Sequence, residues 1–291
     1  MKLNGIYVPL VTPFDRFGQV DHATLETLVE ALVDKGVAGL VACGTTGEYY
    51  ALDDGERSQV LKTVQRAAAD RIGLIAGIGD LSTQRSVERA AEARVIGYHA
   101  VLLSPPPYSL PGQDGIRAHF EYAARNCELP VIIYNFPART GVNVEFDTVA
   151  ALAQQPNIIG IKESSGDFSR ALRLLQARFA DFEVICGCDD QPADFFFWGA
   201  KSWIAGAGNV FPGEQVALHA AAMAGDWDRV RELMRRMYPA LHSMESGDYN
   251  QKAKAGCLNG SLDVGDVRLP LLPLDPAAKQ AFRDLLQGDP Q

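Results

Sequence analysis

The sequence predicts an α/β fold: a (β/α)8 TIM barrel with a C-terminal helical extension. Short apolar runs alternate with amphipathic segments eight times within about 225 residues, and the connections between them are short. Several apolar runs are continuous stretches of Val, Ile and Leu, as in parallel strands that are buried on both faces. Eight strand–helix units of this size fit a closed barrel better than an open doubly wound sheet.

The first four units occupy residues 5–127. Strands are expected at residues 5–13, 39–43, 72–78 and 99–103, and helices at residues 21–35, 53–69, 82–95 and 115–127. The first helix places Leu25, Leu28 and Leu32 on one face, which is the stripe that packs against a sheet. Ser82 and Thr83 stand at the start of the third helix, where side-chain oxygens cap free N–H groups.

The last four units follow the same alternation. Strands are expected at residues 130–134, 158–161, 183–186 and 203–205, and helices at residues 145–154, 168–179, around 195–198 and at 212–224. Residues 226–291 are expected to add two or three helices, packed on the barrel of residues 1–225 as part of one structural unit. The proline-rich stretch 269–276 is expected to be extended.

Composition restricts the functional classes. The net charge of −9 argues against a nucleic-acid or anionic-membrane surface. No apolar run reaches the roughly 18 residues of a membrane span and no signal peptide opens the chain, so we expect a cytoplasmic protein. The five cysteines are scattered, with Cys186 and Cys188 the nearest pair, and are expected to be reduced thiols. The histidines are equally dispersed, so neither a metal nor another cofactor is expected.

The barrel prediction locates the candidate site, because active sites of this fold lie at the carboxyl ends of the strands. Polar and small residues follow several of the predicted strands: Thr45, Thr46, Tyr108, Tyr134, Arg139, Lys162, Gly187, Gly206 and Gly208. Two tyrosines, two threonines, an arginine and a lysine are thus predicted to converge on one mouth. Such convergence from separate strands points to an active site.

Lys162 has two interpretations. It follows the apolar strand Ile158-Ile159-Gly160-Ile161 and precedes small polar residues. As an ordinary strand-end lysine it is solvated, since lysine is almost never fully buried unless it is paired. As an amine partly desolvated in a pocket, it is a nucleophile able to form a Schiff base.

The other candidates also have structural explanations. Thr45 and Thr46 lie between glycines, which is typical of a turn. Tyr134 also suits the end of a core strand, and Tyr108 lies in a proline-rich stretch that suits a stiff loop. Gly206 and Gly208 resemble a phosphate-holding turn but have no basic neighbour. The remaining candidates are interpreted structurally, Glu48 as a turn or interface anchor and residues 195–198 as core or subunit contact.

Three motifs decide between these interpretations. They are Gly44-Thr45-Thr46-Gly47-Glu48, the stretch Tyr-Asn-Phe-Pro-Ala-Arg-Thr-Gly at 134–141, and Gly-Ile-Lys-Glu-Ser-Ser-Gly-Asp at 160–167. In this order and spacing they resemble the dihydrodipicolinate synthase / N-acetylneuraminate lyase family, and the resemblance runs from Gly5 to the C-terminal helices. It implies a class I pyruvate-type lyase on a barrel, usually a homotetramer built as a dimer of dimers, that needs no metal or organic cofactor.

The resemblance assigns roles to individual residues. Lys162 matches the Schiff-base lysine and Tyr134 the tyrosine that moves protons to and from the imine. Thr45 and Tyr108 match the residues that relay those protons, and the tyrosine reaches across a tight dimer interface in relatives. A hydroxyl chain of this kind is chemically reasonable, because a neutral tyrosine is a poor base at pH 7 without assistance.

Binding roles follow in the same way. Thr45 and Thr46 match the residues that hold the pyruvate carboxylate, and Arg139 matches the arginine that binds the carboxylate of the second substrate in the synthase branch. A guanidinium fork suits a planar carboxylate. Gly187 and Ile204 match backbone positions that line the lysine pocket.

Departures from the synthase pattern leave the substrate open. Where synthases usually carry a second tyrosine before Tyr108 and Asn with a basic residue after it, this chain has Pro107, Ser109 and Leu110. The first interpretation is condensation of pyruvate with L-aspartate 4-semialdehyde. The second is a catabolic relative: a pyrroline-4-hydroxy-2-carboxylate deaminase, a sugar-acid dehydratase or a 2-oxo-acid aldolase. The third, a non-catalytic small-acid-binding sensor, is disfavoured by the intact Lys162 and Tyr134.

Overall fold

Eight parallel strands follow one another in chain order around a closed barrel, which confirms the predicted (β/α)8 fold. The computed structural model describes residues 3–287. The chain divides into two compact units, one made by Leu74–Ile204 and the other by Gly5–Gly73 together with the chain after Ile204. Each unit is described by itself.

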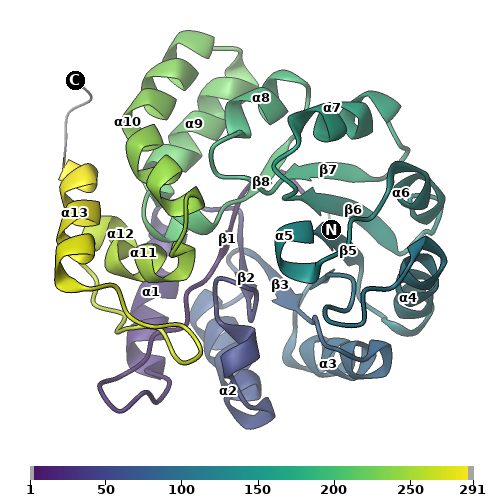
Figure 1. Ribbon diagram of the computed structural model, residues 1–291, viewed down its shortest axis with the longest axis horizontal. Coiled ribbons are helices and arrows are strands. Elements are labelled where there is room, and N and C mark those ends of the chain that lie inside the picture. Colours follow the sequence, from purple (N-terminus) through teal and green to yellow (C-terminus); the bar gives the residue numbers. More distant parts are fainter. Residues whose placement is uncertain (1–2, 288–291) are drawn as a thin grey trace. The chain divides into compact units, whose positions relative to one another are not determined.

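The first unit carries six of the strands and the helices between them (Figure 1). Its elements are β3 (Gly73–Gly77), α3 (Thr83–Ile96), β4 (Ala100–Leu103), α4 (Gln113–Asn126), β5 (Val131–Asn135), α5 (Pro137–Thr140), α6 (Phe146–Leu152), β6 (Ile158–Glu163), α7 (Phe168–Ala177), β7 (Glu183–Cys186), α8 (Pro192–Phe197) and β8 (Ser202–Ile204). In Figure 1 the helices α4, α6 and α7 lie outside the strands β5–β7. The strands bury nearly all of their side chains, as their Val- and Ile-rich sequences predict.

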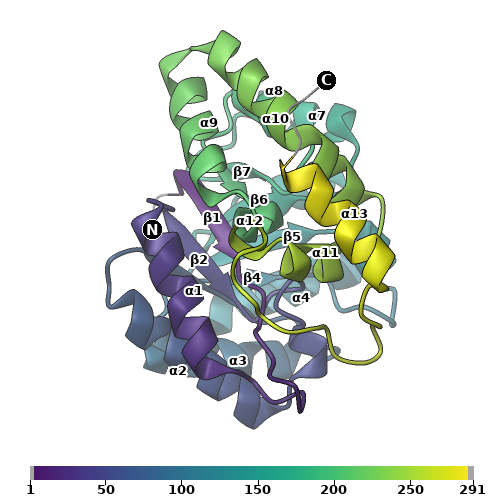
Figure 2. The same cartoon turned by 90° about the vertical axis from the view of Figure 1, so that its left-hand side faces the viewer.

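The second unit combines the first two strands with the C-terminal helices. Its elements are β1 (Gly5–Pro9), α1 (His22–Asp34), β2 (Gly39–Ala42), η1 (Tyr49–Ala51), α2 (Asp54–Ala68), η2 (Gly206–Asn209), α9 (Pro212–Ala224), α10 (Trp227–Glu245), α11 (Tyr249–Ala255), α12 (Cys257–Gly260) and α13 (Pro276–Gln287). Figure 2 shows α13 lying along α10 and α11, with which it is in contact.

Two sequence expectations about this unit need correction. The first strand ends at Pro9 rather than at residue 13, because the N–H of Val11 donates to the side chain of Asn209 instead of to a neighbouring strand. The extension contains four helices in its described part, 226–287, rather than two or three, since a single turn, α12, separates α11 from the last helix. Residues 288–291 of the predicted extension lie outside the described residues.

Helix starts follow the capping rules. Asp21 caps α1 by accepting from the N–H of Thr24, and Asp53 forms a capping box with Glu56 at the start of α2. Ser82 caps α3, as its position predicts. No helix within residues 3–287 is long and apolar enough to cross a membrane.

Candidate active site

Lys162 and Tyr134 are direct neighbours on adjacent strands of the first unit. The register of β5 and β6 pairs the two residues, and the Lys162 Nζ atom lies 4.3 Å from the centroid of the Tyr134 ring. Lys162 is 6% exposed and Tyr134 9% exposed. β6 continues to Glu163, so the lysine lies inside the strand and is buried. The interpretation of Lys162 as a solvated strand-end lysine is therefore wrong.

The Lys162 amine has no carboxylate partner within the described residues 74–204 of this unit. A buried lysine without a counter-ion is rare, because the interior disfavours an unpaired charge. The nearby Tyr134 ring contributes a hydroxyl from the same register position of the adjacent strand. An amine and a phenol held together in this way can form an imine and exchange protons with it.

Gly187 lies directly against Lys162. A Cβ atom at this position would lie 2.9 Å from Lys162 Cγ and 2.6 Å from the carbonyl oxygen of Glu163, and would collide with Ser164 Oγ. The Ser164 hydroxyl donates to the Gly187 carbonyl at 2.9 Å, which ties the end of β7 to the end of β6. Only glycine therefore fits beside the lysine stem. Ile204 is fully buried at the end of β8.

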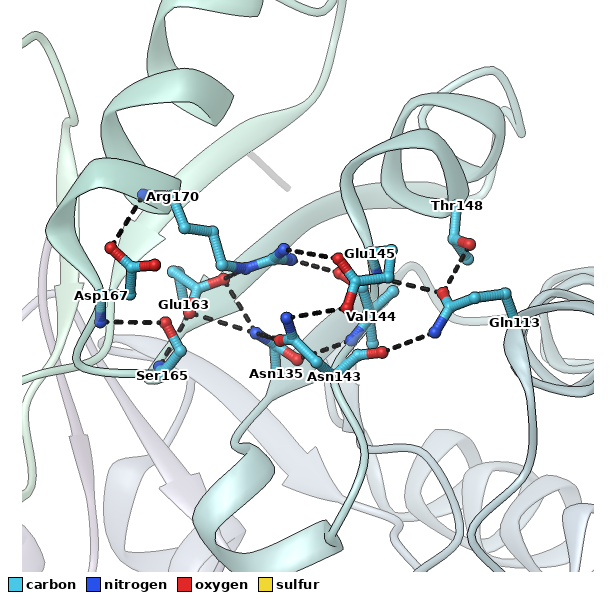
Figure 3. Close-up of polar contacts among 10 residues, drawn as sticks. All are labelled: Gln113, Asn135, Asn143, Val144, Glu145, Thr148, Glu163, Ser165, Asp167 and Arg170. Carbon is cyan, nitrogen blue, oxygen red and sulfur yellow. Dashed lines mark hydrogen bonds and ion pairs between the residues drawn. The ribbon is translucent and has the colours of Figure 1, made fainter.

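Behind the lysine, a buried carboxylate joins the two strands from their other face. Successive residues of a strand point to opposite faces, so Asn135 and Glu163 lie opposite Tyr134 and Lys162. The Glu163 carboxylate accepts from Asn135 Nδ2 at 3.0 and 3.1 Å, from the backbone N–H of Ser165 at 2.8 Å and from Arg170 Nε at 2.9 Å (Figure 3).

Further hydrogen bonds extend this network to the segment after β5. The Asn135 carbonyl oxygen Oδ1 accepts from the N–H of Val144, and Arg170 also donates to the carbonyl of Val144 (Figure 3). The network was not identified from the sequence. Its one signal was Glu163 itself, a carboxylate in a strand whose other residues are apolar or catalytic candidates. The network fixes the strands that carry Lys162 and Tyr134 without contacting either side chain in the described interactions.

Arg139 lies on α5, the single turn that follows β5. Its guanidinium carbon is 5.9 Å from the centroid of the Phe136 ring, and the side chain is exposed. Among the described residues it has no carboxylate partner. The Thr140 hydroxyl donates to the carbonyls of Phe136 and Val142, which holds the turn together. The guanidinium fork is therefore available for a ligand carboxylate.

Tyr108 projects from the loop between β4 and α4 and is 93% exposed. Its backbone has a φ of 72°, and Leu110 in the same loop has a φ of 47°, both in the left-handed region that side chains other than glycine rarely adopt. The Leu110 side chain packs against Gly141, leaving no room for a Cβ atom there. The structure thus places Tyr108 on the surface of its own chain, away from the buried pair.

The start of this loop is fixed by a buried histidine. His119 of α4 lies 3.2 Å from the carbonyl oxygen of Ser104 through Nε2, and 2.8 Å from Thr83 Oγ1 through Nδ1. A carbonyl can only accept, so Nε2 carries the proton and Nδ1 accepts from the threonine hydroxyl. Burial lowers the pKa of His119 to about 4, against a smaller opposing effect of the Ser104 hydrogen bond.

Thr45 and Thr46 belong to the other unit, where they form the turn between β2 and η1. The turn closes through the N–H of Gly47 to the carbonyl of Gly44 and the N–H of Glu48 to the carbonyl of Thr45, both at 3.1 Å. A Cβ atom on Gly47 would lie 2.8 Å from the carbonyl oxygen of Leu10. Thr46 is buried and Thr45 half-buried.

Glu48 ends this turn with its carboxylate in the protein interior. It adopts the left-handed conformation, with φ 54° and ψ 39°, and its carboxylate lies 2.9 Å from Lys254 Nζ. The structural interpretation of Glu48 as a turn anchor is confirmed.

Packing explains the remaining glycines. A Cβ atom on Gly206 would lie 2.9 Å from the Tyr249 ring, and one on Gly208 would lie 2.6 Å from Val8 Cγ2. Both glycines are therefore required for close packing, independently of any phosphate. The five cysteines are free and buried, and desolvation raises the pKa of Cys186 well above its usual value. Within residues 3–287 no group of histidine, cysteine or carboxylate side chains is arranged to hold a metal ion.

Comparison with known proteins gives a consistent result. The profile of the dihydrodipicolinate synthetase family matches residues 2–288. The chain is 38% identical to the 4-hydroxy-tetrahydrodipicolinate synthase of Ectopseudomonas mendocina over 97% of both chains. It is 36% identical to that of Desulfotalea psychrophila over 94% of this chain and 92% of the relative. A crystal structure of a dihydrodipicolinate synthase from Bacillus anthracis superimposes with a TM-score of 0.95 at 32% identity, covering 100% of each chain.

Proposed function

Because this chain belongs to the dihydrodipicolinate synthetase family, we propose that it is a 4-hydroxy-tetrahydrodipicolinate synthase, which condenses pyruvate with L-aspartate 4-semialdehyde. The observation that carries the proposal is the pair formed by Lys162 and Tyr134, buried at one register position of β5 and β6. Curated synthases with 36% to 38% identity over most of the chain support the same assignment.

The chemistry begins at Lys162. Its neutral amine attacks the keto carbon of pyruvate, and loss of water leaves an imine that acts as an electron sink. A proton then leaves the pyruvate methyl group, giving an enamine whose carbon attacks the aldehyde of the second substrate. Tyr134 supplies the protonable oxygen nearest to the amine in its unit and takes part in these proton transfers. Thr45 and Tyr108 complete the relay, and Thr46 helps to bind the pyruvate carboxylate.

Arg139 binds the carboxylate of the semialdehyde in this proposal. Its guanidinium is exposed and has no carboxylate partner among the described residues, so its donors are available to a ligand. Gly187 and Ile204 contribute backbone lining to the lysine pocket. No metal or organic cofactor takes part in the mechanism.

The assembly and location belong to the same proposal. We infer a cytoplasmic homotetramer, built as a dimer of dimers, in which Tyr108 contributes to the site of a second copy. The exposure of Tyr108 on its own chain supports this role, because a relay tyrosine needs a partner surface to be shielded from water.

A catabolic lyase is the second candidate. It is favoured by the loop Pro107–Leu110, whose leucine packs on Gly141 where the synthase pattern has a basic residue. Such an enzyme would retain the imine on Lys162 and act on another small 2-oxo acid or its cyclic equivalent, as a deaminase, dehydratase or aldolase.

Turnover of pyruvate with L-aspartate semialdehyde, coupled to a dipicolinate reductase, tests the proposal. Robust turnover is expected. If there is none while borohydride still traps pyruvate on Lys162, the synthase assignment is wrong and the catabolic candidate replaces it. Lys162→Ala is expected to abolish trapping; trapping on that variant contradicts the assignment of the lysine.

A further inference from the structure

One helix of the C-terminal extension holds both ends of the turn that carries Thr45. Asn250 and Lys254 lie four residues apart on α11, so their side chains project from the same face. Asn250 Nδ2 donates to the carbonyl oxygen of Thr45 at 3.1 Å, and Lys254 Nζ lies 2.9 Å from the Glu48 carboxylate. The two contacts span the turn from Thr45 to Glu48.

The Lys254 contact is deeply buried. Lys254 is 4% exposed and Glu48 is fully buried. The ammonium also donates to the carbonyl of Asp266 at 2.8 Å and lies 4.0 Å from the centroid of the Phe14 ring. Burial lowers the pKa of Lys254 to about 8, although Glu48 and Asp266 favour its charged form. The second Glu48 oxygen accepts from the backbone N–H of Arg268 at 2.9 Å.

Such a pair is a poor device for stability alone. Removing two charges from water costs about as much as their attraction returns, and apolar residues of similar volume often do as well. What the pair does provide is direction: each carboxylate oxygen of Glu48 has one partner, from two separate segments of the extension. Asn250 adds a second fixed point, and its amide also reaches Tyr50 Oη at 3.1 Å.

We propose that Asn250 and Lys254 are positioning residues that orient the Thr45 turn for its part in proton transfer. The inference rests on the proposed function, because it requires Thr45 to take part in catalysis. Neither residue touches the reacting atoms; both act through the backbone and side chains of the turn. The C-terminal extension is thereby a part of the catalytic apparatus.

The test measures exchange of the pyruvate methyl protons for deuterium, followed by NMR. This half-reaction needs the imine and the proton relay but no second substrate. Asn250→Asp keeps the size of the side chain and removes the donor to Thr45. The matched control is Gln251→Glu, which removes an amide donor on the same helix whose acceptor, the carbonyl of Leu272, lies outside the turn.

Asn250→Asp is expected to lower the maximal exchange rate by about ten- to a hundredfold, in line with small misplacements of catalytic groups elsewhere. The apparent KM for pyruvate is expected to change far less, and Gln251→Glu to behave like the parent protein. In a Thr45→Val background, Asn250→Asp is expected to add almost no further loss. A parental exchange rate, or an equal loss in both backgrounds, overturns the proposal.

A second variant covers the case in which Asn250→Asp fails to fold. The double substitution Glu48→Gln with Lys254→Met removes both charges together, so no buried ion is left unpaired. It is expected to lose exchange in the same Thr45-dependent way, and full activity contradicts the role of the pair. Exchange without turnover of the semialdehyde overturns only the synthase assignment, whereas absence of exchange in the parent protein overturns this inference as well.

Discussion

At the scale of single residues, Gly187 determines how closely β7 approaches the lysine. Gly187→Ala is expected to displace the Lys162 stem or Ser164, because the new Cβ atom would lie 2.9 Å from Lys162 Cγ. We predict loss of imine formation, measured by borohydride trapping of pyruvate and mass spectrometry. Gly213→Ala in α9 is the control, since its Cβ atom would meet only Lys35 Cδ at 3.8 Å. Equal trapping by both variants would contradict this account.

Arg139 gives the second prediction at this scale. Arg139→Ala is expected to raise the KM for the semialdehyde by at least about tenfold while that for pyruvate changes little, since a charge-assisted bidentate contact is worth more than about 1.4 kcal/mol. Arg139→Lys retains the charge and loses the fork, so it is expected to restore only part of the affinity. Steady-state kinetics with each substrate varied in turn measures both effects. A larger change in the KM for pyruvate contradicts the assignment.

The sequence predicted single site residues well where position along a strand carries the information. Lys162 and Tyr134 end apolar runs, and a closed barrel brings such ends together. The burial of Lys162 was left open, because exposure of a strand-end lysine depends on how far the strand continues. Asn250 and Lys254 were not identified, since their partners Thr45 and Glu48 are about 205 residues away in sequence.

At the scale of secondary-structure elements, the Glu163 network stabilises the packing of β5, β6 and α7. Arg170→Met removes the charged donor and leaves the Glu163 carboxylate buried without a cation. We predict a loss of about 3 kcal/mol in the free energy of unfolding, the usual cost of breaking a buried pair. Urea unfolding measures it. Arg173→Met on the exposed face of the same helix is the control, and an equal effect of the two variants would rule out a special role for the network.

His119 makes the packing of α3, α4 and the Tyr108 loop sensitive to acid. Its folded pKa of about 4 lies below the model value of 6.5, so the unfolded chain binds the proton more tightly. Its stabilising contribution is therefore complete above pH 6.5, falls as the pH drops towards 4, and amounts to about 3 kcal/mol between those limits.

Urea unfolding at several pH values tests this contribution. In His119→Gln the amide cannot gain a proton, so the variant is expected to lose less stability than the parent protein between pH 6.5 and pH 4. The comparison removes the common effect of the carboxylates, which also titrate in this range. Parallel curves for the two proteins would show that the histidine does not control the acid response.

At the scale of the whole molecule, the barrel was predictable because eight alternating units repeat one simple pattern. The limits of β1 and the number of C-terminal helices were not, because both depend on tertiary contacts. Val11 donates to Asn209, a residue 198 positions away, and no local pattern encodes that bond. The departures around Tyr108 likewise concern a surface residue, whose partner lies outside its own chain in the proposed assembly.

The proposed assembly yields the last prediction. Light scattering is expected to give about four times the chain mass of 31.5 kDa. Lys162→Ala and Tyr108→Phe are each expected to be nearly inactive. When the two inactive proteins are unfolded, mixed and refolded together, a mixed dimer unites an intact Lys162 with an intact Tyr108 at one of its two sites. Activity should therefore reappear on mixing, because the tyrosine acts across the interface. If Tyr108 acted within its own chain, every site would retain one defect and mixing would restore nothing.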